Sequence, residues 1–283
     1  VLCYEDASYQ FPLPRDTVTP AIGPLQYVVD RTLQAAGRDA GVITHFSGGG
    51  GDTVFGYLTN IVPVVDAFLS CGLRTGLKVL RDLSMFHQCT YWRAARLAAR
   101  KLRSNYIPWE AHRAFLSPLP LPEPEPHPWS DGPDDSLPGD RQRILELSSV
   151  QLFRDSSPRS MAGRLRMPLL AQPVVEACLR IPSWMWFDGG QNRAVARAAF
   201  AHALPPRILA RRSKGSFSTY LGVLYRRKLN EIVNFLTSGQ LEGHGLLDAD
   251  GLKALIGSEM PRGENAFLRL FHLCSVENWI RQQ

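Results

Sequence analysis

The sequence predicts an α/β fold that is predominantly helical. One β-rich run, residues 42–46, is followed by four consecutive glycines and then by a helical pattern that begins at Asp52. Several later segments carry apolar residues at helical spacing and no second strand stands out. With 283 residues and 45% hydrophobic content, the chain can bury the core of one large domain or two small ones.

Proline and glycine bound the predicted elements. Residues 1–20 are broken by prolines and predict an extended segment, and Pro24 to Ala36 predicts the first helix, with Gly37 near its end. From Asp52 to about Arg103 the pattern is helical. Proline and glycine signals bound the further helices that we expect, over residues 144–156, 169–181, 192–203, 220–237 and 266–281.

Two segments allow two interpretations each. Residues 117–140 hold eight prolines and predict a loop with polyproline II character, which either borders a peptide groove or is a plain linker. Basic residues from Arg93 to Lys101 recur at a spacing of three to four. They form either the solvated face of an amphipathic helix or a contact for an acidic leader peptide or partner.

The overall charge and the cysteines narrow the class of protein. A formal charge of +6 and a pI near 9.2 suit ATP, pyrophosphate or an acidic peptide, and no nucleic-acid-binding module is present. No apolar run approaches about 18 residues, so we expect no membrane span.

An odd number of cysteines without a C-x-x-C pair predicts reduced thiols and a cytoplasmic location: Cys3, Cys71, Cys89, Cys178 and Cys274. Cys178 lies on an apolar helix face, which predicts packing rather than catalysis.

The glycine run predicts a cradle for phosphate. Bare backbone before a helix offers amide N–H groups to an anion, and glycine lets a phosphate approach closely. Asp52 stands at the lip of the run, where its carboxylate can hold Mg²⁺ against phosphate oxygens or can cap the helix. The alternative for the whole run is a plain glycine-rich turn. The residues of this predicted cradle are Ser47, Gly48, Gly49, Gly50 and Gly51.

Common nucleotide motifs do not fit this run. A Walker loop needs a lysine where Asp52-Thr53 stands, and the Rossmann fingerprint needs a glycine at Thr53. The run is instead similar to a stretch of the asparagine synthetase family, Ser-Gly-Glu-Gly-Ser-Asp-Glu followed by an apolar pair and glycine. The matching residues are Ser47, Gly48, Gly50, Asp52, Phe55 and Gly56, whereas Gly49, Gly51 and Thr53 replace the family's glutamate, serine and second acid.

Further motifs extend this resemblance over roughly 235 residues. Residues 166–171 resemble the family's Arg-x-Pro-Phe-Leu-Asp, residues 211–217 its Arg-x-Lys-Lys-Gly-Phe, and residues 276–280 its closing helix. The resemblance implies one synthetase domain over residues 1–283, the C-terminal part of a PP-loop ATP pyrophosphatase (adenine nucleotide alpha-hydrolase-like) fold. The family's first ATP loop, Ser-Gly-Gly-x-Asp-Ser, is not found, so we expect a domain truncated at its N-terminus that alone does not bind ATP tightly.

The resemblance also implies the chemistry, which is ATP-dependent amide formation through an acyl-adenylate, with Mg²⁺. Lys214 is the expected catalytic cation, on a loop that ends at Gly215, unless it is an ordinary solvated lysine. The expected ATP and pyrophosphate ligands are Ser47, the four glycines, Lys214, Gly215 and Arg166, with Asp52 as the metal ligand. Arg166 and Arg197 have either structural or phosphate-binding roles, and Arg211 and Arg212 either bind an acidic substrate or are solvated.

The departures from the family pattern favour one branch. Gly49 cannot accept or deliver a proton, unlike the glutamate at that position. The all-glycine run, Ala171 and the Arg-Arg-Ser-Lys-Gly ending resemble lasso peptide cyclases, which implies macrolactam closure of a precursor peptide and a leader peptidase or leader-binding partner. One alternative is asparagine synthase (glutamine-hydrolysing), or another amidotransferase relative, acting on a small carboxylate substrate. Another is a non-catalytic remnant that binds a peptide or partner.

Overall fold

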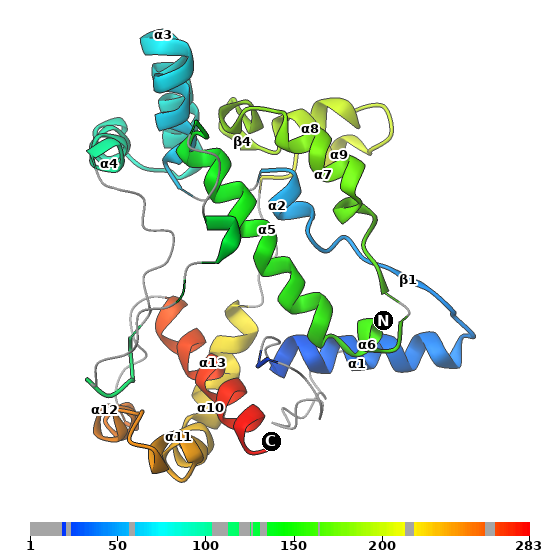
Figure 1. The fold of residues 1–283 in the computed structure, drawn as a ribbon, viewed down its shortest axis with the longest axis vertical. Coiled ribbons are helices and arrows are strands. Elements are labelled where there is room, and N and C mark those ends of the chain that lie inside the picture. The colour runs from blue at the N-terminus through cyan, green and yellow to red at the C-terminus, as the bar shows by residue number, and fades with distance from the viewer. Residues whose placement is uncertain are drawn as a thin grey trace.

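A computed structural model shows a helix-rich α/β chain whose described residues include two short two-stranded sheets, which confirms the predicted helix-rich α/β class (Figure 1). Figure 1 shows α3 and α4 together at one end, α10 to α13 as a group at the other, and α5 between them. The structure describes residues 19–20, 24–56, 60–103, 113–118, 125, 127–130, 135–163, 165–212, 218–257 and 264–283.

The elements follow one another along the chain in this order. The helices of the first half are α1 (Pro24–Asp39), α2 (Gly51–Val54), α3 (Val62–Phe86), α4 (Tyr91–Arg103), α5 (Pro138–Ser156) and α6 (Pro158–Met161). Those of the second half are α7 (Gln172–Leu179), α8 (Ala194–Ala199), α9 (Pro206–Leu209), α10 (Ser218–Thr237), α11 (Gln240–Gly243), α12 (Ala249–Lys253) and α13 (Glu264–Ile280). Among the described residues, the 3₁₀ turns are η2 (Pro128–Ser130), η3 (Pro168–Leu170) and η4 (Ser183–Trp186), and the strands are β1 (His45–Phe46), β2 (Leu165–Arg166), β3 (Phe187–Asp188) and β4 (Gln191–Asn192).

Helices bounded by clear start and stop signals match the prediction, as α1, α10 and α13 show. The helical pattern predicted from Asp52 to about Arg103 is present as three helices, α2, α3 and α4. α5 starts at Pro138, so the last three residues of the loop predicted over 117–140 are helical. Proline is well tolerated in the first turn of a helix. The predicted strand over 42–46 is reduced to His45–Phe46.

The helix predicted from residue 192 begins two residues later, at Ala194, because Asn192 belongs to an antiparallel ribbon. β3 and β4 are joined by Gly189 and Gly190, whose φ angles are 55° and 74°. A two-residue hairpin turn with positive φ at both positions strongly favours glycine. This Gly-Gly pair was therefore an available hairpin signal that the helical interpretation of the segment overlooked.

The described residues form two separate apolar cores. The first lies among α3, α4, α7 and η4, and its centre includes Val64, Leu83, Ala98 and Trp186. The second lies among α10 to α13 and includes Ile232, Leu236, Leu252, Leu270 and Cys274.

Cys178 packs in the first core, where burial raises the pKa of its thiol, which agrees with the predicted packing role. Cys71, in contrast, is exposed. Within the described part of the chain, no helix is long and apolar enough to cross a membrane.

Asp66 joins three elements of the first core from a fully buried position on α3. Its carboxylate accepts hydrogen bonds from the Gly139 amide (3.0 and 3.1 Å) at the start of α5 and from the Ser183 hydroxyl of η4. Burial raises the pKa of Asp66 from 3.8 to about 6, although both hydrogen bonds act in the opposite direction.

This raised pKa predicts a pH-dependent stability. The folded state binds the Asp66 proton more tightly than the unfolded state, so stability should fall as the pH rises from about 4 to about 6. The difference in pKa corresponds to roughly 3 kcal/mol. Urea unfolding between pH 4 and 7 should show this loss in the wild type relative to Asp66→Asn, whose amide does not titrate. A wild-type stability that tracks Asp66→Asn at every pH would contradict the prediction.

Candidate functional site

The site begins where two parallel strands end side by side. β1 pairs with β2 in parallel, with His45 opposite Leu165 and Phe46 opposite Arg166. The ladder continues by one bond, from the Ser47 amide to the Arg166 carbonyl oxygen (2.9 Å). Because parallel strands end at the same edge, the glycine run and the 3₁₀ turn η3 leave this edge together. The pairing joins residues about 120 positions apart and brings two of the predicted motifs into contact.

The glycine run is folded on itself. The Gly49 amide donates to the Ser47 Oγ (3.1 Å), and the Gly51 amide donates to the Gly48 carbonyl oxygen (3.1 Å). Two of the amides expected to be open are therefore already used inside the run. Gly50 caps α2 with a φ of 80°, a left-handed conformation that glycine adopts without strain. Since α2 has four residues, its dipole contributes little to anion binding.

One side of the run is closed and the other is open. A Cβ added at Gly50 would lie 2.3 Å from the Leu170 side chain, and one at Gly51 would lie 2.8 Å from Leu169. A Cβ added at Gly49 would lie 3.3 Å from the Met167 Sδ. Gly48 is exposed, and no described atom lies within 4 Å of its Cβ position. A ligand that reaches this backbone would therefore approach over Gly48.

The contrast between the two glycines gives a matched pair of variants. Gly50→Ala should lower the free energy of unfolding by about 2 kcal/mol or more, because alanine is strained at positive φ and its methyl group meets Leu170. Gly48→Ala should change it by less than about 1 kcal/mol, since its methyl group enters open space. Thermal or urea unfolding of both variants measures this difference. Equal losses at the two positions would contradict the described shape of the run.

Asp52 follows the glycine run in the first turn of α2 and is bound by an arginine. Its Oδ1 accepts a hydrogen bond and ion pair from the Arg193 guanidinium, with Asp52 45% and Arg193 28% exposed at their side chains. Arg193 follows the β3–β4 ribbon and caps α8 in a left-handed conformation. The structure thus shows a cation on the carboxylate that was predicted to hold Mg²⁺. Sequence reasoning missed this contact.

Arg197 has a structural role, one of the two that the sequence left open. Its guanidinium donates to four backbone carbonyl oxygens, and these belong to Asn192 (2.9 Å), Ile208 (3.3 Å), Leu209 and Arg211 (2.8 Å). The side chain therefore ties α8 to α9 and to the segment that follows α9. Arg193 and Arg197 are one helical turn apart, so α8 connects Asp52 to the backbone at Arg211.

A family model described as asparagine synthase matches residues 12–281. The chain belongs to the asparagine synthase family. The searches of curated proteins and of solved structures each gave no match. Members of this family are ATP-dependent ligases, and the assignment indicates ATP-dependent amide-bond formation.

The structure describes some of the other residues predicted for the site of this asparagine synthase family chain and leaves others outside the described residues. Arg166 is exposed on β2, opposite Phe46, and its backbone contacts Ser47. Lys214 and Gly215 lie outside the described residues, so their roles stay predictions. Among the residues that the structure describes, no group of three or more histidines, cysteines or acids converges. Mg²⁺ commonly uses one or two carboxylates together with substrate phosphates, and Asp52 offers one carboxylate, whose Oδ1 already accepts from Arg193.

A small cavity adjoins the closed side of the glycine run. Its volume is about 280 Å³, and Leu170, which covers Gly50, also forms part of its wall. The wall is mostly apolar but includes one cation and one acid. The lining residues are Trp129, Leu147, Val150, Arg154, Leu170, Gln172, Val175 and Glu176. Apolar walls with a few charged groups are typical of sites for small ligands or single side chains.

Proposed function

We propose that the chain contributes the phosphate-binding half of a ligase site that closes a macrolactam ring in a precursor peptide. The fold proposed for it is the C-terminal part of a PP-loop synthetase domain. The observation that carries the proposal is the connection from Asp52 through Arg193 and Arg197 to Arg211. Lys214 follows Arg211 by three residues, a length of chain that spans at most about 11 Å. This short tether supports a lysine that acts on the same phosphates as the glycine run.

The proposed reaction has two steps. A carboxylate of the substrate attacks the α-phosphorus of ATP, forms the acyl-adenylate and releases pyrophosphate. An amine then attacks the acyl carbon, forms the amide and releases AMP after losing a proton. Negative charge develops on phosphate and carbonyl oxygens in both steps, so aimed cations and N–H groups supply most of the stabilisation.

Particular groups of this chain would take these roles. The backbone over Gly48 receives the pyrophosphate, Lys214 neutralises its charge and Arg193 keeps the Asp52 carboxylate at the lip. A Mg²⁺ ion held by Asp52 would supply further positive charge for the phosphate oxygens.

The surroundings of Gly49 support the peptide-cyclising branch. The family's glutamate is replaced there by glycine, and the nearest side-chain atoms to its Cβ position are the Met167 sulfur and the Ser47 hydroxyl. Neither group is a good acid or base for ammonia transfer at neutral pH. In a cyclase, the amine is the N-terminus of the precursor peptide itself. A leader peptidase and a leader-binding protein are the proposed partners.

The proposed function is tested by identifying the products of the whole protein with Mg-ATP. The substrate in one reaction is a short precursor peptide encoded beside the gene, and in the other it is aspartate with glutamine. We expect a peptide lighter by one water, with equal amounts of AMP and pyrophosphate. Asp52→Asn should lower this rate by about 100-fold, in the range for loss of one charge-stabilising group.

Three outcomes would contradict the proposal. Asparagine as the only product would identify the chain as an asparagine synthase proper. Formation of ADP and phosphate would exclude an acyl-adenylate. An absence of nucleotide turnover with every substrate would favour a non-catalytic binding protein.

A further inference from the structure

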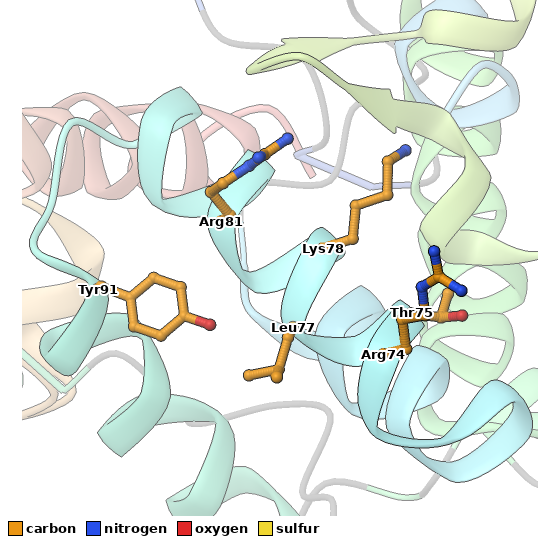
Figure 2. A pocket seen from close by; sticks show the side chains of 6 residues that line it. All are labelled: Arg74, Thr75, Leu77, Lys78, Arg81 and Tyr91. Carbon is orange, nitrogen blue, oxygen red and sulfur yellow. The ribbon is translucent and has the colours of Figure 1, made fainter.

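A cleft between α3 and α4 lies outside the site described above. It has a volume of about 640 Å³ and opens beside the second half of α3 and the first residue of α4. The backbone of Gly72 is non-helical and separates this second half from the first. Figure 2 shows the side chains that line the cleft, which are Arg74, Thr75, Leu77, Lys78, Arg81 and Tyr91.

Three cations line one wall at helical spacing. Arg74, Lys78 and Arg81 are separated by four and three residues, so they share one face of α3. The Lys78 ammonium donates to the Asp188 Oδ1 (2.8 Å) and lies 3.8 Å from the buried Asp82 carboxylate, which is also 3.7 Å from Arg81. The hydrogen bond to Asp188 orients Lys78. Arg74 has no acid within ion-pair distance among the residues that the structure describes.

Apolar side chains adjoin these cations. Leu77 and Tyr91 line the cleft at 40% and 37% exposure, and Leu73, one turn before Leu77, is 70% exposed. Trp92, next to Tyr91, is 80% exposed. Single exposed apolar residues are ordinary on a protein surface, but exposed apolar side chains that line a cleft, as Leu77 and Tyr91 do, are typical of an interaction site.

The charged and apolar groups of the cleft together indicate which class of ligand it would bind. The three cations and the two acids leave the cleft with one net positive charge, whereas a nucleic acid duplex carries a phosphate about every 1.7 Å of its axis. Phosphates would also gain nothing from the leucines and the tyrosine ring. A peptide with one or two carboxylates and neighbouring apolar side chains matches both components of the surface.

We propose that the α3–α4 cleft is a docking site for an acidic, amphipathic peptide segment of a partner protein. Carboxylates of this segment pair with Arg74 and Arg81, and its apolar side chains cover Leu73, Leu77 and Tyr91. Lys78 stays with Asp188. No residue of the cleft belongs to the glycine run or to its contacts, so the docking site stands independently of the proposed ligase function.

The test uses fluorescence anisotropy with the whole protein and a labelled synthetic helical peptide. The peptide carries glutamates at i and i+4 beside leucines at i+3 and i+7, and a scrambled peptide of equal composition is the first control. Arg74→Glu/Arg81→Glu should raise the Kd at least 10-fold, and Leu77→Ser should raise it several-fold without a change in charge. Arg226→Glu/Arg227→Glu, two exposed arginines on α10, makes the same charge change elsewhere and should stay within twofold.

Several results would overturn the proposal. The scrambled peptide binding equally well, or an equal loss in the α10 variant, would show unspecific attraction by charge. Tighter binding of labelled single-stranded DNA or of vesicles rich in anionic lipid, lost in Arg74→Glu/Arg81→Glu, would assign the cleft to those ligands instead. Should circular dichroism show that the reversal variant is unfolded, Arg74→Gln/Arg81→Gln provides the same comparison, and unchanged binding there would refute the docking site.

Discussion

Replacing Lys214 with alanine is expected to lower the rate of amide formation by about 10²–10³-fold while the protein remains folded. The reason is that a cation aimed at developing negative charge typically contributes about 3–4 kcal/mol to transition-state stabilisation. The rate is measured as AMP released per enzyme in the presence of substrate. Far-ultraviolet circular dichroism and a thermal melt establish that the variant is folded.

Lys228→Ala is the matched control for this prediction. Lys228 is a partly exposed lysine on α10 that pairs with Glu231 (2.8 Å), and its loss should leave the rate within about twofold. A Lys214→Ala variant that turns over at the wild-type rate would remove Lys214 from the mechanism. A similar loss in both variants would show that overall charge, rather than one aimed ammonium group, controls the rate.

The largest effect on stability is expected at Glu277 of the closing helix α13. Its fully buried carboxylate accepts hydrogen bonds from the amides of Gln240 (2.8 Å) and Leu241 (2.9 Å) and from the Arg281 guanidinium (2.5 Å). Burial alone would raise the pKa of Glu277, but these donors outweigh burial and lower it. Glu277→Ala leaves two amides and an arginine without their acceptor, so the free energy of unfolding should fall by about 3–4 kcal/mol.

The control for Glu277 is Glu231→Ala, which removes an exposed carboxylate paired only with Lys228 in the described ion pairs. Its cost should stay below about 1 kcal/mol in the same urea unfolding series. The lowered pKa also sets the direction with pH: the contribution of Glu277 is present above the ordinary glutamate pKa and is lost as the pH falls through the folded value. Equal losses of unfolding free energy in Glu277→Ala and Glu231→Ala would contradict the role of Glu277 as a buried acceptor.

Local signals predicted what depends on neighbouring residues in the sequence. Proline at Pro24 and the helical spacing after it gave α1, and a similar pattern gave α10 and α13. The glycine run was correctly placed between β1 and a helix at residue 51 or 52. The helical pattern over residues 52–103 did not show where α2, α3 and α4 begin and end, because apolar spacing alone does not mark the end of a helix without a strong breaker.

Local sequence signals could not predict the contacts between segments that are distant in the sequence. The parallel pairing of Phe46 with Arg166, and the ion pair of Asp52 with Arg193, join residues that no local rule connects. The resemblance nevertheless placed Asp52 and Arg166 in motifs of one family pattern. The contacts of Arg197 with the backbone show why an arginine one turn after Arg193 matters, since its guanidinium fixes the chain that leads toward Lys214.

The most direct test of the account is the affinity of the whole protein for magnesium pyrophosphate, measured by calorimetry in a double-mutant cycle of Gly48→Ala and Lys214→Ala. If the open backbone at Gly48 and the ammonium group of Lys214 hold the same anion, each single variant should bind at least about 10-fold more weakly. The double variant should bind more weakly than either single variant, since both groups contribute to holding one ligand. Unchanged affinity in Gly48→Ala or in Lys214→Ala would contradict a shared pyrophosphate site.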